Sequence, residues 1–155
     1  METITIHRSL YGLFRIFIVG MVASSAVFAL AHMVGQGHTL DDFVPTTFIV
    51  GILDLLGFVS LVITVVAMLV YDAGKIILSA QGISVVSYQT LFWSTSGMCE
   101  WRDVEDASVI KTSVVGGLFD IGELRIETAG TRPNLSLSWV PRVSYWQEYV
   151  VPHAK

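Results

Sequence analysis

The sequence predicts an α+β membrane protein, in which a transmembrane helix hairpin precedes a small β-rich domain. Two apolar runs carry this prediction, because residues 16–34 contain no formally charged side chain and residues 48–70 contain one, Asp54. The second run has 23 residues, and a helix of that length spans about 34 Å, enough to cross a hydrocarbon core of about 30 Å. After Tyr71, apolar and polar residues alternate with the period of a β-strand.

The composition agrees with a membrane protein and limits the classes of function. Hydrophobic residues make up 53% of the chain and charged residues 14%, against about a quarter charged in ordinary soluble domains. From Lys75 onward, seven Lys and Arg residues oppose eight Asp and Glu residues, which gives this segment a net charge of −1. Such a segment lacks the basic face that nucleic-acid binding requires. The single cysteine, Cys99, excludes an internal disulfide and a multi-cysteine metal site.

The first apolar run follows a short segment that contains Arg8 and Arg15. A signal peptide shares this pattern, and Ala29-Leu30-Ala31 resembles the small-x-small end of a cleavage site. The run has 19 residues, which exceeds the usual apolar core of a signal peptide. We therefore expect an uncleaved helix over residues 10–34.

The second run predicts a helix over residues 46–71, which completes a hairpin domain of residues 1–71. Residues 35–45 contain two glycines and a proline and predict the connecting loop. This loop contains no Lys or Arg, whereas basic residues lie beyond the other end of each helix. The positive-inside rule then places both termini in the cytoplasm and the loop outside.

Small residues recur on one stripe of each predicted helix. Spacings of three and four residues place side chains on the same helix face. These residues are Gly20, Ser24, Val27 and Ala31 in the first helix, and Asp54, Gly57, Ser60, Thr64 and Ala67 in the second. Small side chains let two helix backbones approach closely in lipid, so the stripes predict a packed hairpin. They would serve equally for contact with other integral membrane subunits.

Asp54 is the unusual member of its stripe, because a charged side chain at the centre of a membrane helix costs about 2.5–3.5 kcal/mol. Three interpretations stay open. In the first, Asp54 is protonated and hydrogen-bonds Ser24 or Ser25, which lie at a similar depth in the first helix. In the second, Asp54 contacts another membrane subunit. In the third, it belongs to an ion or proton path, for which His32 is the other candidate group.

Residues 72–155 predict a small domain of short strands closed by one helix. Gln81-Gly82 predicts a tight hairpin between two strands, because glycine adopts the positive φ that such turns need. The predicted elements are strands over residues 75–80, 83–88, 107–113, 122–128 and 135–139, loops at Gly116-Gly117 and 129–133, and an amphipathic helix over 143–151.

The helix pair and this strand pattern together resemble the bacterial pleckstrin-homology-like (PH-like) membrane proteins. The matching segments are Leu78-Ser79-Ala80-Gln81-Gly82-Ile83, Trp101-Arg102-Asp103-Val104 with Val109, residues 122–130, and Val140-Pro141. The resemblance covers residues 72–151 and the general layout of the helices. It implies a β-roll with a C-terminal helix, a place in the bacterial inner membrane, partners in larger membrane assemblies, and no shared catalytic residues.

The resemblance also raises the question of lipid-headgroup binding, which requires a basic cluster in an early loop. Residues 90–99 occupy that position and contain no Lys or Arg, so we do not expect phosphoinositide-type binding. The same segment contains Leu91, Phe92 and Trp93. These side chains predict contact with the membrane interface or a partner, or equally an ordinary strand in the domain core.

No pattern in the sequence predicts catalysis, a cofactor or a metal site. The histidines are scattered, Cys99 has no recognisable activating base nearby, and Gly116-Gly117 lacks the Lys-Ser/Thr of a phosphate-binding loop. We therefore expect a non-catalytic, membrane-anchored interaction protein that serves as an accessory, scaffolding or assembly subunit of a larger complex. The alternatives are a stand-alone envelope protein that binds lipid or a small ligand, and a chain whose Asp54 serves an ion path.

Overall fold

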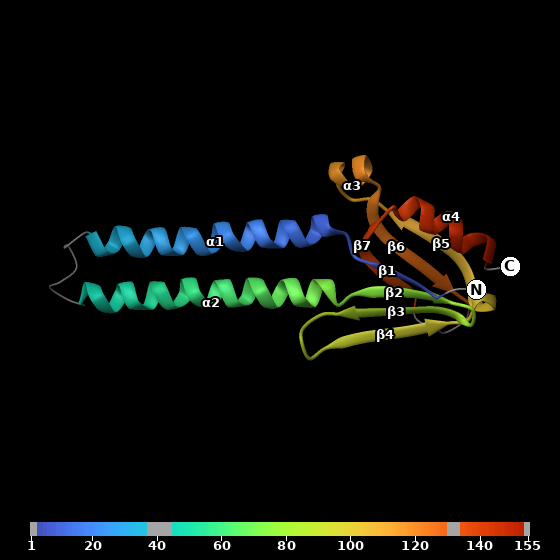
Figure 1. Ribbon diagram of the computed structural model, residues 1–155, viewed down its shortest axis with the longest axis horizontal. Helices are drawn as coiled ribbons and strands as arrows, with labels where there is room; N and C mark the ends of the chain where they lie inside the picture. Colours follow the sequence, from blue (N-terminus) through green and yellow to red (C-terminus); the bar gives the residue numbers. More distant parts are fainter. Residues whose placement is uncertain (1–2, 37–44, 130–133, 154–155) are drawn as a thin grey trace. The chain divides into compact units, whose positions relative to one another are not determined.

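The computed structural model describes residues 3–36, 45–129 and 134–153, and it has the predicted α+β class (Figure 1). Two long apolar helices precede antiparallel sheets and a short C-terminal helix. The chain divides into two compact units, which we call the helix unit and the β unit. The helix unit is Leu13–Met68, and the β unit combines Met1–Gly12 with Leu69–Lys155.

The two long helices are α1 (Leu10–Gln36) and α2 (Thr46–Asp72), each of 27 residues. At 1.5 Å per residue each helix is about 40 Å long. Their mean hydropathies are 2.1 and 2.6, so both are long and apolar enough to cross a membrane. Most of the predicted connecting loop falls outside the described residues, although Gly35 and Gln36 still belong to α1.

The β unit begins with a strand that the sequence analysis did not predict. This strand, β1 (Ile4–His7), precedes α1 and pairs antiparallel with β2 (Lys75–Ser79), which follows α2. Together with β3 (Gly82–Tyr88) and β4 (Ser94–Cys99), they form a four-stranded sheet in the order β1-β2-β3-β4. The N-terminal residues therefore belong to the β unit, whereas the sequence analysis assigned them to the hairpin domain.

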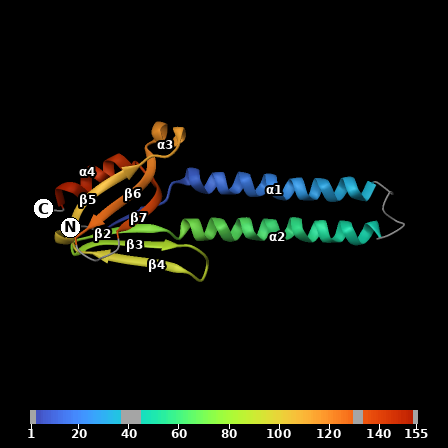
Figure 2. The ribbon, with the colours of Figure 1, turned by 180° about the vertical axis from the view of Figure 1, so that it is seen from behind.

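A second sheet has the order β5-β6-β7 and is covered by the C-terminal helix (Figure 2). Its elements are β5 (Val104–Ile110), β6 (Ile121–Thr128), β7 (Leu135–Pro141) and α4 (Val143–His153). These elements overlap the strands and the helix expected from the alternating pattern. The Gln147 side chain fixes α4 on the sheet, because its Nε2 donates a 2.8 Å hydrogen bond to the Ala107 carbonyl.

The loop predicted at Gly116-Gly117 was wrong, because residues Val114–Phe119 form a short helix, α3. Ser113 is the N-cap of this helix, and its hydroxyl accepts a 3.0 Å hydrogen bond from the Gly116 N–H. Asp120 ends it in the left-handed conformation, with φ of 53°. Two glycines in sequence favoured a loop, but these two end contacts outweigh their low helix propensity.

The two sheets and α4 share one hydrophobic core. Its most deeply buried members come from every layer and are Ile76, Leu78, Ile83, Cys99, Ala107, Leu124, Ile126, Leu137, Val140, Val143 and Val150. In β6 the buried residues alternate with half-buried ones, as the sequence pattern predicted. At about 25 cal/mol per Å² of apolar surface, burial of these side chains is the main force that holds the sheets together.

Candidate functional site

The interior of the helix unit contains most of the small residues that the sequence placed at a helix interface. Gly20 lies so close to Thr64 that a Cβ at residue 20 would overlap the threonine side chain. Ser24 is only 2% exposed, and its hydroxyl lies 3.1 Å from the Ser60 hydroxyl of α2. Thr64 is also buried, and its hydroxyl donates a 2.8 Å bond to the Ser60 carbonyl.

The same contact continues toward the other end of the helices. A Cβ at Gly57 would meet the Phe28 ring at 2.8 Å. Ala31 is 1% exposed. Small side chains thus allow close packing of α1 and α2 within the helix unit, as the predicted stripes require.

Asp54 does not join this interior. Its residue is exposed, and the Ser24 hydroxyl lies 2.9 Å from the Gly20 carbonyl instead of meeting a carboxylate. The reason is geometric, because each step of three residues along a helix turns back by about 60°. Two such steps separate Asp54 from Ser60 and rotate Asp54 out of the contact. The first of the three interpretations, a hydrogen bond from Asp54 to Ser24 or Ser25, is therefore not observed.

A hollow of about 540 Å³ lies beside Asp54. Its other described lining residues are Gly35, Pro45, Thr46, Thr47, Val50 and Gly51. Gly51 faces open space, since a Cβ there would meet no atom within 4 Å. Within the described part of the helix unit, Asp54 thus lies on the outer face of α2, next to Gly51.

In the β unit, the predicted aromatic segment is an exposed loop between β3 and β4. The exposed fractions of Leu91, Phe92 and Trp93 are 47%, 95% and 71%. The loop has a defined conformation, because the Gln89 N–H donates to the Trp93 carbonyl at 2.9 Å and the Thr90 hydroxyl accepts from the Trp93 N–H at 3.0 Å. The alternative of a strand packed in the core is not observed for these side chains.

A second exposed apolar segment, α3, was missed by sequence reasoning. Val114, Leu118 and Phe119 are 82%, 77% and 68% exposed. The signal was present in the sequence as VVGGLF, but the two glycines led to the prediction of a loop. We refer to the β3–β4 loop residues Leu91, Phe92 and Trp93, together with these three α3 residues, as the apolar tips.

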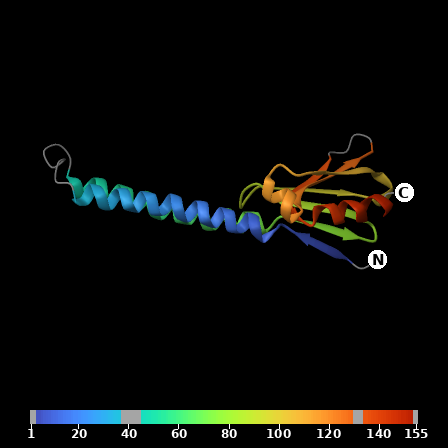
Figure 3. The same ribbon diagram turned by 90° about the horizontal axis from the view of Figure 1, so that it is seen from above.

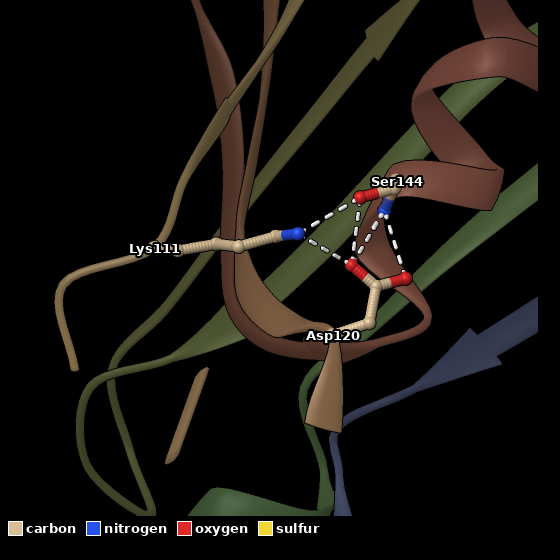
Figure 4. Close-up of polar contacts among 3 residues, drawn as sticks. All are labelled: Lys111, Asp120 and Ser144. Carbon is tan, nitrogen blue, oxygen red and sulfur yellow. Dashed lines mark hydrogen bonds and ion pairs between the residues drawn. The ribbon is translucent and has the colours of Figure 1, made fainter. Parts of the chain in front are cut away.

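A polar cluster fixes the C-terminal end of α3 to α4 (Figure 4). Lys111 Nζ lies 2.7 Å from Asp120 Oδ1 and donates to Ser144 Oγ at 2.9 Å. The Ser144 hydroxyl donates to Asp120 Oδ1 at 2.7 Å, and its backbone N–H, in the first turn of α4, donates to the same carboxylate. Burial alone would raise the pKa of Asp120, but these hydrogen bonds and the Lys111 charge outweigh it and lower the pKa below its ordinary value.

Another group of polar contacts lies in the β unit, next to the first residues of α1 and the last residues of α2. The Arg8 guanidinium lies 5.2 Å from the centre of the Tyr71 ring and donates a 3.1 Å hydrogen bond to Ser87 of β3. The Tyr71 hydroxyl donates to the Ser9 carbonyl at 3.0 Å. Burial lowers the pKa of Arg8, but a guanidinium still keeps its charge at neutral pH.

The described residues of the β unit also contain a small hollow, and no cluster of metal-ligand side chains lies in the described part of the chain. The hollow has a volume of about 240 Å³ and is lined mostly by Val85, Ser87, Gln89, Thr95, Ser96, Asn134 and Ser136. In the described ranges, no group of three or more His, Cys, Asp or Glu side chains could hold a metal ion. Cys99, 1% exposed, belongs to the hydrophobic core.

Comparison of this chain with known protein families, with curated proteins and with solved structures found no match.

Proposed function

We propose that this chain is a membrane-anchored interaction protein that serves as an accessory or assembly subunit of a larger membrane complex. In this proposal α1 and α2 span the bacterial inner membrane, and a PH-like β unit lies on the cytoplasmic side. The length and hydropathy of the helices support the anchor. Two antiparallel sheets closed by a C-terminal helix support the PH-like assignment.

The position of Asp54 carries the proposal. An acid that faces lipid costs about 2.5–3.5 kcal/mol, so such residues usually have a partner. The small residues between α1 and α2 leave Asp54 on the outside, beside an open hollow and the uncovered Gly51. A partner helix that offers a hydrogen-bond donor or a cation at this depth would remove the cost and fill the hollow.

Co-purification from native membranes in a mild detergent tests this function. We expect a stable membrane protein to be recovered with the wild-type chain and to be lost with Asp54→Leu. Asp54→Asn keeps the hydrogen-bonding capacity and should retain part of the recovery. Ile52→Leu is the matched control, because Ile52 is 44% exposed in the same part of α2 and the change conserves volume.

The proposal would be contradicted by a wild-type chain that purifies alone as a monomer. Recovery of the same partner with Asp54→Leu would show instead that another surface makes the contact.

A further inference from the structure

The apolar tips lie at one end of the β unit, the end at which the chain continues into both helices. The register of the first sheet shows this for the β3–β4 loop. His7, the last residue of β1, pairs with Lys75, the first residue of β2, and Lys75 pairs with Val86 near the end of β3. The loop that follows β3 therefore extends from the sheet end where α1 begins and α2 finishes.

The register of the second sheet places α3 at the same end. Helix α3 joins the last residue of β5 to Ile121, the first of β6, and Ile121 pairs with Pro141 at the end of β7. Close to this point, the Trp139 carbonyl accepts a 2.7 Å hydrogen bond from the Ser9 N–H, and the Trp139 ring lies 6.1 Å from that of Tyr11. Figure 3 shows α3 and the β3–β4 loop at one end of the β unit.

The chemistry of both tips suits lipid. The tips expose Leu, Phe, Trp and Val side chains, and residues 89–99 and 112–119 contain no charged side chain. Aromatic residues of this kind are enriched where protein meets the membrane–water interface. Leu10, at the start of α1 and 82% exposed, lies at the same end of the β unit. Both tips also have fixed backbones, because the Thr90 contacts hold one and the Lys111–Asp120–Ser144 cluster holds the other.

We propose that the apolar tips insert together into the surface of the lipid bilayer that holds α1 and α2. The β unit then contacts the membrane through its own side chains and is not only tethered by its helices. This inference depends on the proposed membrane anchor and is independent of the proposed partner at Asp54. Continuity of the chain favours lipid as the occupant, because the tips lie at the sheet end where α1 begins and α2 finishes.

Fluorescence quenching in membranes tests the proposal with the full chain. Single cysteines are introduced at Phe92 and Leu118 in a Cys99→Ala background, labelled with a polarity-sensitive dye and reconstituted into phosphatidylethanolamine–phosphatidylglycerol vesicles. Lipids with a nitroxide near the headgroup should quench both dyes. The emission of both dyes should also shift to shorter wavelength, because the dyes leave water. The control is Gln81→Cys, which is exposed in the β2–β3 turn at the opposite end of the sheet and should not be quenched.

Two other outcomes would overturn the proposal, and each has its own pattern of quenching. Dyes at residues 92 and 118 that behave like the one at Gln81 would show that the tips remain in water. Dyes protected from aqueous iodide but not quenched by the lipid nitroxide would show that a protein, or a second copy of this chain, covers the tips. A dye at Val62, 47% exposed on α2, reports insertion separately, with a nitroxide deep in the acyl chains. Without quenching at Val62 the anchor fails as well.

Discussion

At the β2–β3 turn, the backbone conformation and the close approach of another strand require glycine at residue 82. Gly82 in the β2–β3 turn has φ of 154°, and a Cβ there would overlap the Cys99 carbonyl. We expect Gly82→Ala to lower the free energy of unfolding of the β unit by about 1–3 kcal/mol, measured by thermal unfolding with near-ultraviolet circular dichroism. Gly117→Ala is the control, since Gly117 has open space and helical surroundings, and it should gain up to about 1 kcal/mol. Equal effects of the two changes would contradict this account.

Asp120 gives the stability a defined dependence on pH. The pKa of Asp120 is lower in the folded state than in the unfolded chain. The ionised carboxylate therefore adds to the free energy of unfolding above the unfolded pKa of about 4, and this stabilisation is lost as the pH falls through the folded pKa. Asp120→Asn should therefore unfold at a lower temperature than wild type at pH 7, with the difference shrinking in acid. Asparagine also tolerates the left-handed conformation, which makes it a matched replacement. A difference that persists unchanged at pH 2 would contradict the role of the charge.

Among the elements, α1 and α2 separate a packing face from an outer face. A larger side chain at Gly20 would overlap Thr64, so Gly20→Leu should cost the helix pair about 1–3 kcal/mol. Gly51→Leu introduces the same side chain where no atom lies within 4 Å, and should leave the pair intact. Unfolding titrations with dodecyl sulfate would measure both. If Gly51→Leu lowers recovery of the proposed membrane partner without loss of stability, the outer face is the contact surface.

Sequence patterns predicted the elements well where one period continued for a long stretch. Long apolar runs indicated α1 and α2, and the alternation of apolar and polar residues indicated β6. Three short elements, β1, β4 and α3, escaped prediction. In β4 the sequence STSGMC has no alternation of apolar and polar residues. In β1, Ile4 and Ile6 alternate with polar residues for only four positions, and the partner strand lies beyond both helices. In α3, the Ser113 hydroxyl cap and the left-handed Asp120 are local contacts at the two helix ends, which the helix propensities of residues 114–119 do not include.

The candidate site was predictable only in part, because spacing along a helix defines a face with limited precision. Gly20, Ser24 and Thr64 lie in the helix contact as their spacing suggested. Asp54 does not, since repeated steps of three residues rotate a side chain away from the starting face. The exposure of Phe92 likewise depends on the turn formed by Thr90, which the hydrophobic pattern alone could not distinguish from a core strand.

For the whole molecule, the N-terminal strand completes the β unit from a distant part of the chain. Ile6 is 3% exposed within the core, whereas the neighbouring Thr5 points outward. Ile6→Ala should lower the free energy of unfolding of the β unit by about 2–4 kcal/mol, because it leaves a cavity. Thr5→Ala should change it by less than about 1 kcal/mol. Thermal unfolding of the full chain in detergent measures both, and similar small effects would show that β1 is dispensable.

The pairing of β1 with β2 has a consequence for biogenesis. Ile4 and Leu78 are register partners, yet the ribosome makes both helices between them. During synthesis β1 must remain unpaired until β2 emerges, and the two strands can meet only if both lie in the same compartment. In the proposed membrane topology, an α2 that failed to cross back would separate the two strands and leave the sheet incomplete. In the proposed topology, β1 therefore pairs with β2 only in chains whose two strands reach the same side of the membrane.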